Sequence, residues 1–390
     1  MLGGLYLAWR FIAYHRGRTT VLVAAISLSM FLPLATQLIV QRFESQSMLR
    51  ARSTPLVVGA KGSRFGLTIH ALYFRGESPP LISQAEVSRI ESTKLARTIP
   101  LFARFRVQGF PIVGTTADYL DWRGLVVQRG GPLAMLGDCL VGATVARSLD
   151  VEPGDRLLSE PENAFDLAGP SPLRMRVTGV LRPTGTADDE IVLCDLKTAW
   201  IIQGIGHGHA PIQNTSPETD RPDEPHLASR ENLGEFTEVT SENVRSFHFH
   251  GRADQFPLTA IIAIAPSEKD GTLLMGKYLG ADETHQILRP VEVVEELMQM
   301  IDHFRQLLDL GALLLAVATG LLVGLVLLLS LRLRRREIHT MRLLGCSRMA
   351  ILKLVAAELV IVVVLSAALA FILAQAASSL SQSLITHLIA

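Results

Sequence analysis

Three long apolar stretches divide the chain. They cover residues 19–40, 310–331 and 354–374, and Glu358 in the third is the only charged residue among them. A helix rises about 1.5 Å per residue, so the shortest stretch reaches about 31 Å, enough to cross the hydrocarbon core of a bilayer. Pro33 lies within the first stretch, where neighbouring helices can satisfy the carbonyl that a proline frees. The pattern therefore predicts three transmembrane helices.

Basic residues are concentrated on one side of these stretches. Arg16 and Arg18 precede the first, four arginines at 332–336 follow the second, and Arg348 and Lys353 precede the third. Such positive flanks mark the cytoplasmic side. We therefore expect residues 1–18 and the loop 332–353 in the cytoplasm, and residues 41–309 and the tail 375–390 outside it.

The segment 41–309 is long enough to fold around a core of its own. Short β-rich runs bounded by glycine and proline lie at 53–62, 105–116, 173–186 and 256–266. Helical patterns lie at 83–95, 142–149, 195–203 and 291–309, and the last continues into the second apolar stretch. The alternation predicts a large α+β extracytoplasmic domain on a membrane α-helical protein. Residues 206–243, rich in Pro, Asn, Ser and acids, predict a long flexible insertion.

Composition agrees with a membrane protein. Apolar residues make up 48% of the chain, charged residues 19%, and the formal net charge is zero, so no global field favours nucleic acid. Cys139 and Cys194 lie in the extracytoplasmic segment and could form at most one disulfide. Cys346 lies in the basic loop.

The segment 334–360, whose charged half is expected in the cytoplasm, predicts two helices with a sharp break. Ile338, Met341 and Leu344 recur at helical spacing opposite arginines, Gly345 can adopt the left-handed conformation that ends a helix, and Ser347 can cap the next one. One interpretation is an amphipathic helix lying on anionic headgroups. The other is a docking element for a cytoplasmic partner.

Four stretches, in order along the chain, resemble FtsX/MacB-like permeases, the membrane subunits of type VII ABC transporters. One is the series Arg336-Glu337-Ile338, the run from Arg342 to Arg348, and Glu358 in the following span. The others are residues 8–29, the run 57–63, and residues 142–155 with 177–186. Such permeases usually have four spans, so this chain resembles a three-span variant.

The resemblance implies a permease subunit of the bacterial inner (cytoplasmic) membrane with a MacB-like periplasmic domain and no catalytic activity. Its implied partners are a cytosolic ABC ATPase, a second permease copy (homodimer) or related permease, a periplasmic adaptor or lipoprotein, and membrane lipid. ATP and Mg²⁺ would bind the ATPase, since no G-x-x-x-x-G-K-[ST] motif occurs in this chain and no cofactor is expected in it. The implied function is mechanotransmission, in which ATP-driven motion serves efflux or lipid/lipoprotein extraction in the periplasm. The residues expected to couple to the ATPase are Arg336, Glu337, Ile338, Arg342, Leu344, Gly345, Ser347 and Arg348.

Two further features lie inside the predicted spans. Gly320 and Gly324 form a G-x-x-x-G pattern, which lets two helices approach closely. Glu358 is costly in lipid, and we expect Arg348, Lys353 or water to satisfy it at the inner interface.

Four histidines are weak candidates for a metal site: His207, His209, His248 and His250. Alternate residues of a strand share one face, and imidazole is a ligand for zinc and copper. No cysteine or acid completes a ligand spacing, and flexible ligands must be ordered before coordination, so we expect only weak binding and assign no metal site. No elbow or oxyanion motif is present, so no catalytic residue is predicted.

Two other functions fit the same features. One is a membrane-anchored sensor or metal-binding scaffold that works without an ATPase. The other is a regulator of a cell-wall hydrolase. An ABC ATPase gene beside this one would separate the permease from the scaffold.

Overall fold

The structure is a computed structural model that describes residues 6, 10, 12–14, 16–161, 172–209, 236–333, 335–343 and 346–388. The chain divides into two compact units. One is Met1–Gln46 with Glu296–Ala390, and the other is Ser47–Glu295.

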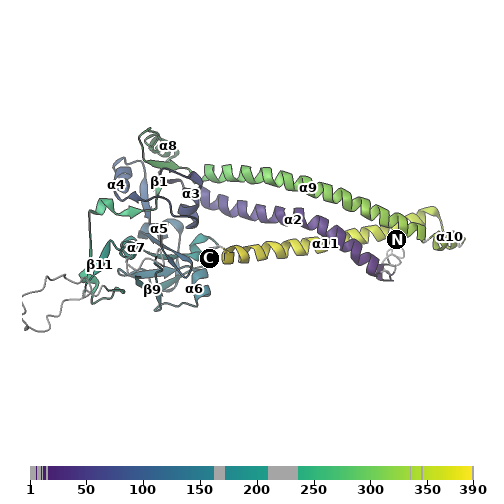
Figure 1. Cartoon of the computed structure of the whole chain (residues 1–390), viewed down its shortest axis with the longest axis horizontal. Coiled ribbons are helices and arrows are strands. Elements are labelled where there is room, and N and C mark those ends of the chain that lie inside the picture. Colours follow the sequence, from purple (N-terminus) through teal and green to yellow (C-terminus); the bar gives the residue numbers. More distant parts are fainter. Residues whose placement is uncertain are drawn as a thin grey trace, which may run out of the picture. The chain divides into compact units, whose positions relative to one another are not determined.

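Long helices make up the first unit (Figure 1). They are α2 (Arg16–Arg52), α9 (Pro290–Leu333), the short α10 (Arg335–Leu343) and α11 (Arg348–Leu388). Three of them contain segments long and apolar enough to cross a membrane, at Thr19–Gln41, Pro290–Val326 and Ile351–Ser379. The prediction of three membrane-spanning helices is therefore confirmed by length and composition.

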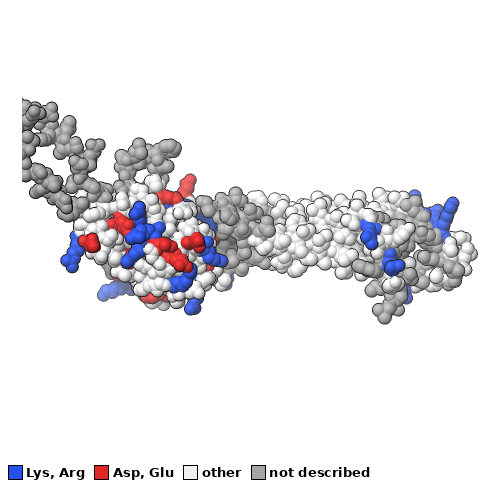
Figure 2. All heavy atoms as spheres, turned by 90° about the horizontal axis from the view of Figure 1, so that it is seen from below, with Lys and Arg blue, Asp and Glu red and all other residues white. Residues whose placement is uncertain are grey.

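Large apolar side chains are exposed along the candidate spans of these helices. Leu321 is 72% exposed and Leu325 66%. Figure 2 shows a long face of the helical unit without charged side chains and, toward one end of it, lysines and arginines. Such a surface needs lipid or another apolar chain to cover it.

Small side chains line the buried face of α11. Ser366, Ala370 and Ala374 are each 0% exposed and follow one another at one-turn spacing. The Ser27 hydroxyl of α2 donates a hydrogen bond of 3.0 Å to the Ser366 carbonyl. Small residues let backbones approach closely in lipid, so this stripe explains how α2 and α11 pack together.

The helices are longer than the apolar stretches alone indicate. Helix α2 continues from the first stretch to Arg52, with Pro33 inside it, and α11 continues to Leu388. Helix α9 runs unbroken from Pro290 to Leu333, as its helical spacing predicts.

The second unit is an α+β domain with two main sheets, as the sequence predicts. The first has the order β15-β1-β14-β3 and the second β4-β5-β10-β7-β9-β6, with β8 paired to β9. The strands of the first are β1 (Leu56–Ala60), β3 (Arg97–Leu101), β14 (Ala260–Ile264) and β15 (His285–Leu288). Those of the second are β4 (Arg106–Val107), β5 (Phe110–Thr115), β6 (Val127–Gly130), β7 (Asp138–Val141), β8 (Arg156–Leu158), β9 (Arg174–Leu181) and β10 (Val192–Asp195).

Short helices and two small two-stranded sheets complete this domain. The α-helices are α3 (Arg64–Tyr73), α4 (Ala85–Ser92), α5 (Ala117–Arg123), α6 (Ala143–Leu149), α7 (Leu196–Ile202) and α8 (Glu268–Gly276), and the 3-10 helices are η1 (Ala187–Glu190), η3 (Val244–Ser246) and η4 (Ala253–Gln255). The small sheets pair β11 (Gly206–Gly208) with β12 (Phe247–Phe249), and β2 (Ile82–Ser83) with β13 (Pro257–Leu258). One apolar core, which includes Phe102, Ile112 and Met175, holds these elements together.

Cys139 and Cys194 are free and buried within this core. Cys139 and Cys194 lie directly opposite each other on the antiparallel strands β7 and β10. Burial raises the pKa of both thiols, so neither is a reactive thiolate.

The expected flexible insertion 206–243 differs from the structure at both of its ends. Residues 206–208 form β11, and Val239 is buried in the core. Pairing with β12 orders the first end, and apolar contact orders the second. The middle of the segment, residues 210–235, lies outside the described residues.

Candidate functional site

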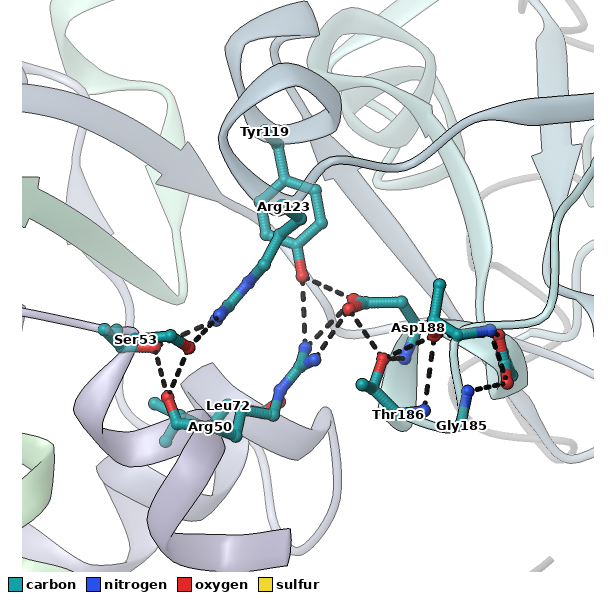
Figure 3. A network of polar contacts seen from close by, with 11 residues as sticks. Arg50, Ser53, Leu72, Tyr119, Arg123, Gly185, Thr186 and Asp188 are labelled. Carbon is teal, nitrogen blue, oxygen red and sulfur yellow. Dashed lines mark hydrogen bonds and ion pairs between the residues drawn. The ribbon is translucent and has the colours of Figure 1, made fainter.

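The last turn of α2 is held by a buried ion pair in the α+β domain (Figure 3). The Arg50 guanidinium donates to both carboxylate oxygens of Asp188, at 2.6 and 2.9 Å, and to the Tyr119 hydroxyl at 3.2 Å. Its Nε donates to the Leu72 carbonyl. Tyr119 in turn donates to Asp188 at 2.7 Å. Such a two-pronged pairing fixes the direction of the arginine as well as its charge.

A second arginine binds the end of the same helix. Arg123, the last residue of α5, donates to the hydroxyls of Ser53 and Thr54, each at 2.9 Å. Both hydroxyls also donate to the Arg50 carbonyl, which lies among the unpaired carbonyls of the helix end. A positive group near a helix C-terminus is stabilising. Arg50, Tyr119, Arg123 and Asp188, with Ser53 and Thr54, are called the polar junction below.

Hydrogen bonds within residues 184–189 hold Asp188 in place. Thr186 accepts from the Asp188 amide at 3.3 Å and donates to its side chain at 3.1 Å. The neighbouring Asp189 carboxylate accepts from the amides of Thr184 and Gly185, at 2.8 and 2.7 Å. These bonds fix the turn that precedes η1, so the position of Asp188 does not depend on Arg50 alone.

Gly142 lets this loop pack against α6. A Cβ added there would lie 2.4 Å from the carbonyl oxygen of Asp189 and 2.5 Å from that of Asp188. Both carbonyl oxygens belong to the backbone, so they could move only if the loop itself moved. Glycine is therefore required at the N-terminal end of α6 because the backbone that carries Asp188 passes so close.

Burial and charge act in opposite directions in the polar junction. Burial alone would raise the pKa of Asp188, but its bonds to Arg50 outweigh burial and hold that pKa below its ordinary value. Burial alone would lower the pKa of Arg50, while Tyr119 and Asp188 raise it overall. Burial raises the pKa of Tyr119 to about 12. The tyrosine is therefore a neutral donor between two ions.

Both ends of the α+β domain meet in neighbouring strands. Strand β1 follows α2, and β15 precedes α9. They pair antiparallel, with Val57 opposite Leu288 and Val58 opposite Ile287. Pro290 begins α9, a position where the missing amide proton costs nothing. The chain therefore enters and leaves the domain through one sheet.

The predicted coupling residues lie on the segment from α10 to the start of α11. Arg336, Glu337, Ile338 and Arg342 are on α10, Ser347 precedes α11, and Arg348 begins it. The Ile351 amide donates to the Ser347 carbonyl at 3.3 Å, and Arg348 is exposed. Leu344 and Gly345, where the break is predicted, lie outside the described residues.

The two intramembrane features differ in exposure. An added Cβ at Gly320 or Gly324 would meet no atom within 4 Å in the described part of the chain, so this stretch of α9 is open on that side. Glu358 is 6% exposed on α11.

The four candidate metal ligands come together on the small sheet β11–β12. His207 and His248 lie opposite each other. His209 directly follows β11, and His250 directly follows β12. The alternation within each pair is visible in the sequence. The pairing of the two segments across residues 210–235 is not.

The polar junction was missed by reasoning from the sequence. Arg50 follows the first apolar stretch, and its partner Asp188 is 138 positions away. The run Asp188-Asp189-Glu190, one residue after Pro183-Thr184-Gly185-Thr186, was the one local signal of a structured acidic turn.

Comparison with known proteins gives three findings. Residues 310–390 match the family described as FtsX-like permease C-terminal. No curated protein matches the chain. Among solved structures, it is similar to the extracellular domain of the noncanonic ABC-type transporter YknZ from Gram-positive bacteria, with 10% identity, 60% of this chain and 98% of that one covered, and a TM-score of 0.33. It is also similar to the periplasmic region of MacB from Actinobacillus actinomycetemcomitans, with 10% identity, 64% and 95% covered, and a TM-score of 0.33.

Proposed function

We propose that this chain, whose residues 310–390 match the FtsX-like permease C-terminal family, transmits the ATP-driven motion of a separate ATPase to the periplasm. The family match is the observation that carries the proposal. The chain is a multi-pass protein of the inner membrane with its α+β domain in the periplasm, and it acts as a membrane subunit of an ABC transporter. ATP and Mg²⁺ belong to the partner ATPase in this proposal.

At the cytoplasmic side, α10 and the first turn of α11 are the proposed docking element. Helix α10 carries Arg335, Arg336 and Arg342 together with Glu337. Helix α10 ends at Leu343 and α11 begins at Arg348, so the two helices follow each other closely along the chain. Contacts of these charged side chains with the ATPase would let its closure move the start of α11.

At the periplasmic side, the polar junction is the proposed point of delivery. Helix α2 is continuous from Arg16 to Arg52, so a shift along its axis is carried through its hydrogen bonds to the turn that holds Arg50. There the buried pairing with Asp188 resists separation, because either ion alone would be left buried without its partner. Pairing of β1 with β15 would link this movement to the start of α9.

A second permease copy is the proposed partner within the membrane. The open side of α9 at Gly320 and Gly324 suits a closely packed helix of that copy. The proposed periplasmic work is efflux or extraction of a lipid or lipoprotein, with an adaptor or lipoprotein as the client.

Reconstitution with the neighbouring ATPase tests the proposal. The purified chain and the ATPase are placed in lipid, and ATP hydrolysis is compared with and without the permease. Glu337→Lys and Gly345→Val should each reduce the stimulation several-fold, because one reverses a docking charge and the other disfavours the left-handed helix end. Arg252→Gln is the control, since Arg252 is 74% exposed in the periplasmic domain.

The alternative interpretation of the loop predicts a different result. For an amphipathic helix lying on lipid, Glu337→Lys adds positive charge, strengthens attraction to anionic headgroups and leaves hydrolysis unchanged. If both variants insert at normal levels and stimulate hydrolysis like the unmodified chain, the coupling role of residues 332–353 is wrong.

A further inference from the structure

Four histidines lie on one face of the two-stranded sheet β11–β12. His207 of β11 lies directly opposite His248 of β12. His209 and His250 are two positions along from them, and alternate residues of a strand point to the same side. All four rings therefore share one face, although the two strands are separated in the sequence by a long insertion.

The rings lie close to one another. The centroid of His207 is 4.6 Å from that of His209, 4.9 Å from that of His248 and 4.7 Å from that of His250. Ring nitrogens of His207, His209 and His248 all lie within 4.8 Å of one another. Tetrahedral zinc with bonds of about 2.0–2.1 Å holds its ligand nitrogens roughly 3.4 Å apart. Binding would therefore require rotation of the side chains that brings these nitrogens closer together.

The opposite face of the sheet is anchored to the domain core. Gly206 and Gly208 occupy that face, and an added Cβ would lie 2.7 Å from the Phe249 ring and 2.8 Å from the Phe247 ring. Both phenylalanines pack against the core. The His250 amide donates to the Ile205 carbonyl at 2.9 Å, which extends the pairing beyond the two strands.

This anchoring removes the reason for expecting weak metal binding. That expectation rests on a flexible segment, whose ligands must be ordered before they can coordinate. Here the backbone of both histidine pairs is fixed by strand pairing and by apolar contact. Only side-chain torsions remain to be set.

Two ring nitrogens support a ligand role. Nδ1 of His248 lies 3.1 Å from the Ser246 carbonyl, a contact that requires a proton on Nδ1 and leaves the lone pair of Nε2 free. Ligating histidines commonly donate their other nitrogen to a carbonyl in this way. Nδ1 of His209 is buried and has no hydrogen-bond partner among the described residues. A metal ion would satisfy it.

The four imidazole side chains favour one class of metal ion. Imidazole nitrogen suits borderline ions such as Zn²⁺, whereas Mg²⁺ and Ca²⁺ require oxygen donors and Cu(I) favours sulfur. We propose that His207, His209, His248 and His250 form a periplasmic binding site for a divalent transition-metal ion, Zn²⁺ in the first place. This site is independent of the proposed coupling to an ATPase.

Zinc competition with the full chain tests the site. The protein in detergent is stripped of metal and titrated with Zn²⁺ against a chromophoric chelator. We expect one tight equivalent per chain. The double variant His207→Ala/His248→Ala should bind at least about 100-fold more weakly, since loss even of groups that only orient ligands costs about 10–100-fold. His303→Ala, which removes an exposed histidine on α9, is the matched control and should bind normally.

Two further measurements keep the result interpretable. X-ray absorption of the zinc-loaded protein should show three or four imidazole nitrogens at about 2.0 Å and no sulfur. The melting temperature of the metal-free double variant should equal that of the metal-free unmodified chain, because the altered rings lie on the face away from the core. If the double variant is destabilised, His209→Gln replaces it and should weaken binding at least tenfold. Equal zinc affinity in all variants, or a sulfur ligand, would overturn the proposal.

Discussion

A single carboxylate neutralises the guanidinium that α2 brings into the α+β domain. Arg50 is 6% exposed and Asp188 3%. In such surroundings two ions attract strongly, but each has also lost its water. The pair therefore adds little net stability while making the loss of either partner costly.

Replacing Asp188 with asparagine should lower the free energy of unfolding by about 3–5 kcal/mol, because Arg50 would remain buried without a counter-ion. Urea unfolding of the chain in detergent, followed by tryptophan fluorescence, measures this. Asp254→Asn is the control. Its pair with Arg252 is exposed, so the change should stay within about 1 kcal/mol. Similar stabilities for the two variants would mean that Asp188 does not hold α2.

His70 should make the domain sensitive to mild acid. Burial, with a smaller contribution from Arg106, lowers its pKa from 6.5 to about 4. As the pH falls, the unfolded chain therefore takes up this proton before the folded chain does, and stability drops between about pH 6.5 and 4. The loss should approach about 3 kcal/mol at the lower limit.

Melting temperature measured against pH tests this effect. His70→Leu should flatten the curve between pH 6.5 and 4, whereas His303→Leu, at an exposed site, should leave the curve unchanged. Asp188 has a lowered pKa, so its contribution is present at higher pH and is lost only as the pH falls below the ordinary range of aspartate. Loss of stability below pH 4 should therefore persist in His70→Leu. An unaltered slope above pH 4 would show that His70 is not the titrating group.

For single residues, the sequence indicates which side chains could bind a metal or form an ion pair. It does not indicate which of them meet in the folded protein. The alternation of His207 with His209, and of His248 with His250, predicts that each pair shares a face. Nothing local predicts that the two pairs meet, because their contact depends on the apolar anchoring of Phe247 and Phe249. The pairing of Arg50 with Asp188 also cannot be predicted locally, because the two residues are 138 positions apart in the sequence.

Among the elements, α2 extends beyond the end that its hydropathy pattern predicts. The apolar stretch ends near Val40, but the helix continues to Arg52. The continuation is polar, and its last turn is fixed by tertiary contacts from Tyr119, Arg123 and Asp188. The patterns for α4, α6, α7 and α9 predict their helices correctly, because each is periodic within its own segment.

The three cysteines provide a test of topology at the scale of the element. Cys346 is exposed between α10 and α11, while Cys139 and Cys194 are buried. A maleimide that cannot cross membranes should label Cys346 in inverted membrane vesicles and not in intact spheroplasts. Cys346→Ser should abolish labelling until the protein is unfolded. Labelling of Cys346 in intact spheroplasts would show that the predicted orientation of the helices is wrong.

On the scale of the whole molecule, the apolar face of α9 at Gly320 and Gly324 is the proposed contact with a second copy of the chain. Replacing Gly320 and Gly324 with isoleucine should weaken self-association, because branched side chains hold a neighbouring helix away. Cross-linking in native membranes measures this. The control is Leu321→Ile with Leu325→Ile, a volume-conserving change at exposed positions beside the glycines. Equal dimer yields from the two double variants would remove this face from the interface.

The α+β domain begins and ends at adjacent positions, since β1 and β15 are neighbours in one sheet. Val57 and Leu288 face each other across a strand spacing of about 4.8 Å, so some 230 residues are inserted between two points that almost touch. A module with adjoining ends can be exchanged without altering what carries it. Cut at Ser47, so that the turn with Arg50 is retained, the domain should be obtainable as a soluble fragment. A different domain whose ends adjoin in the same way would fit between α2 and α9 without any change in either helix.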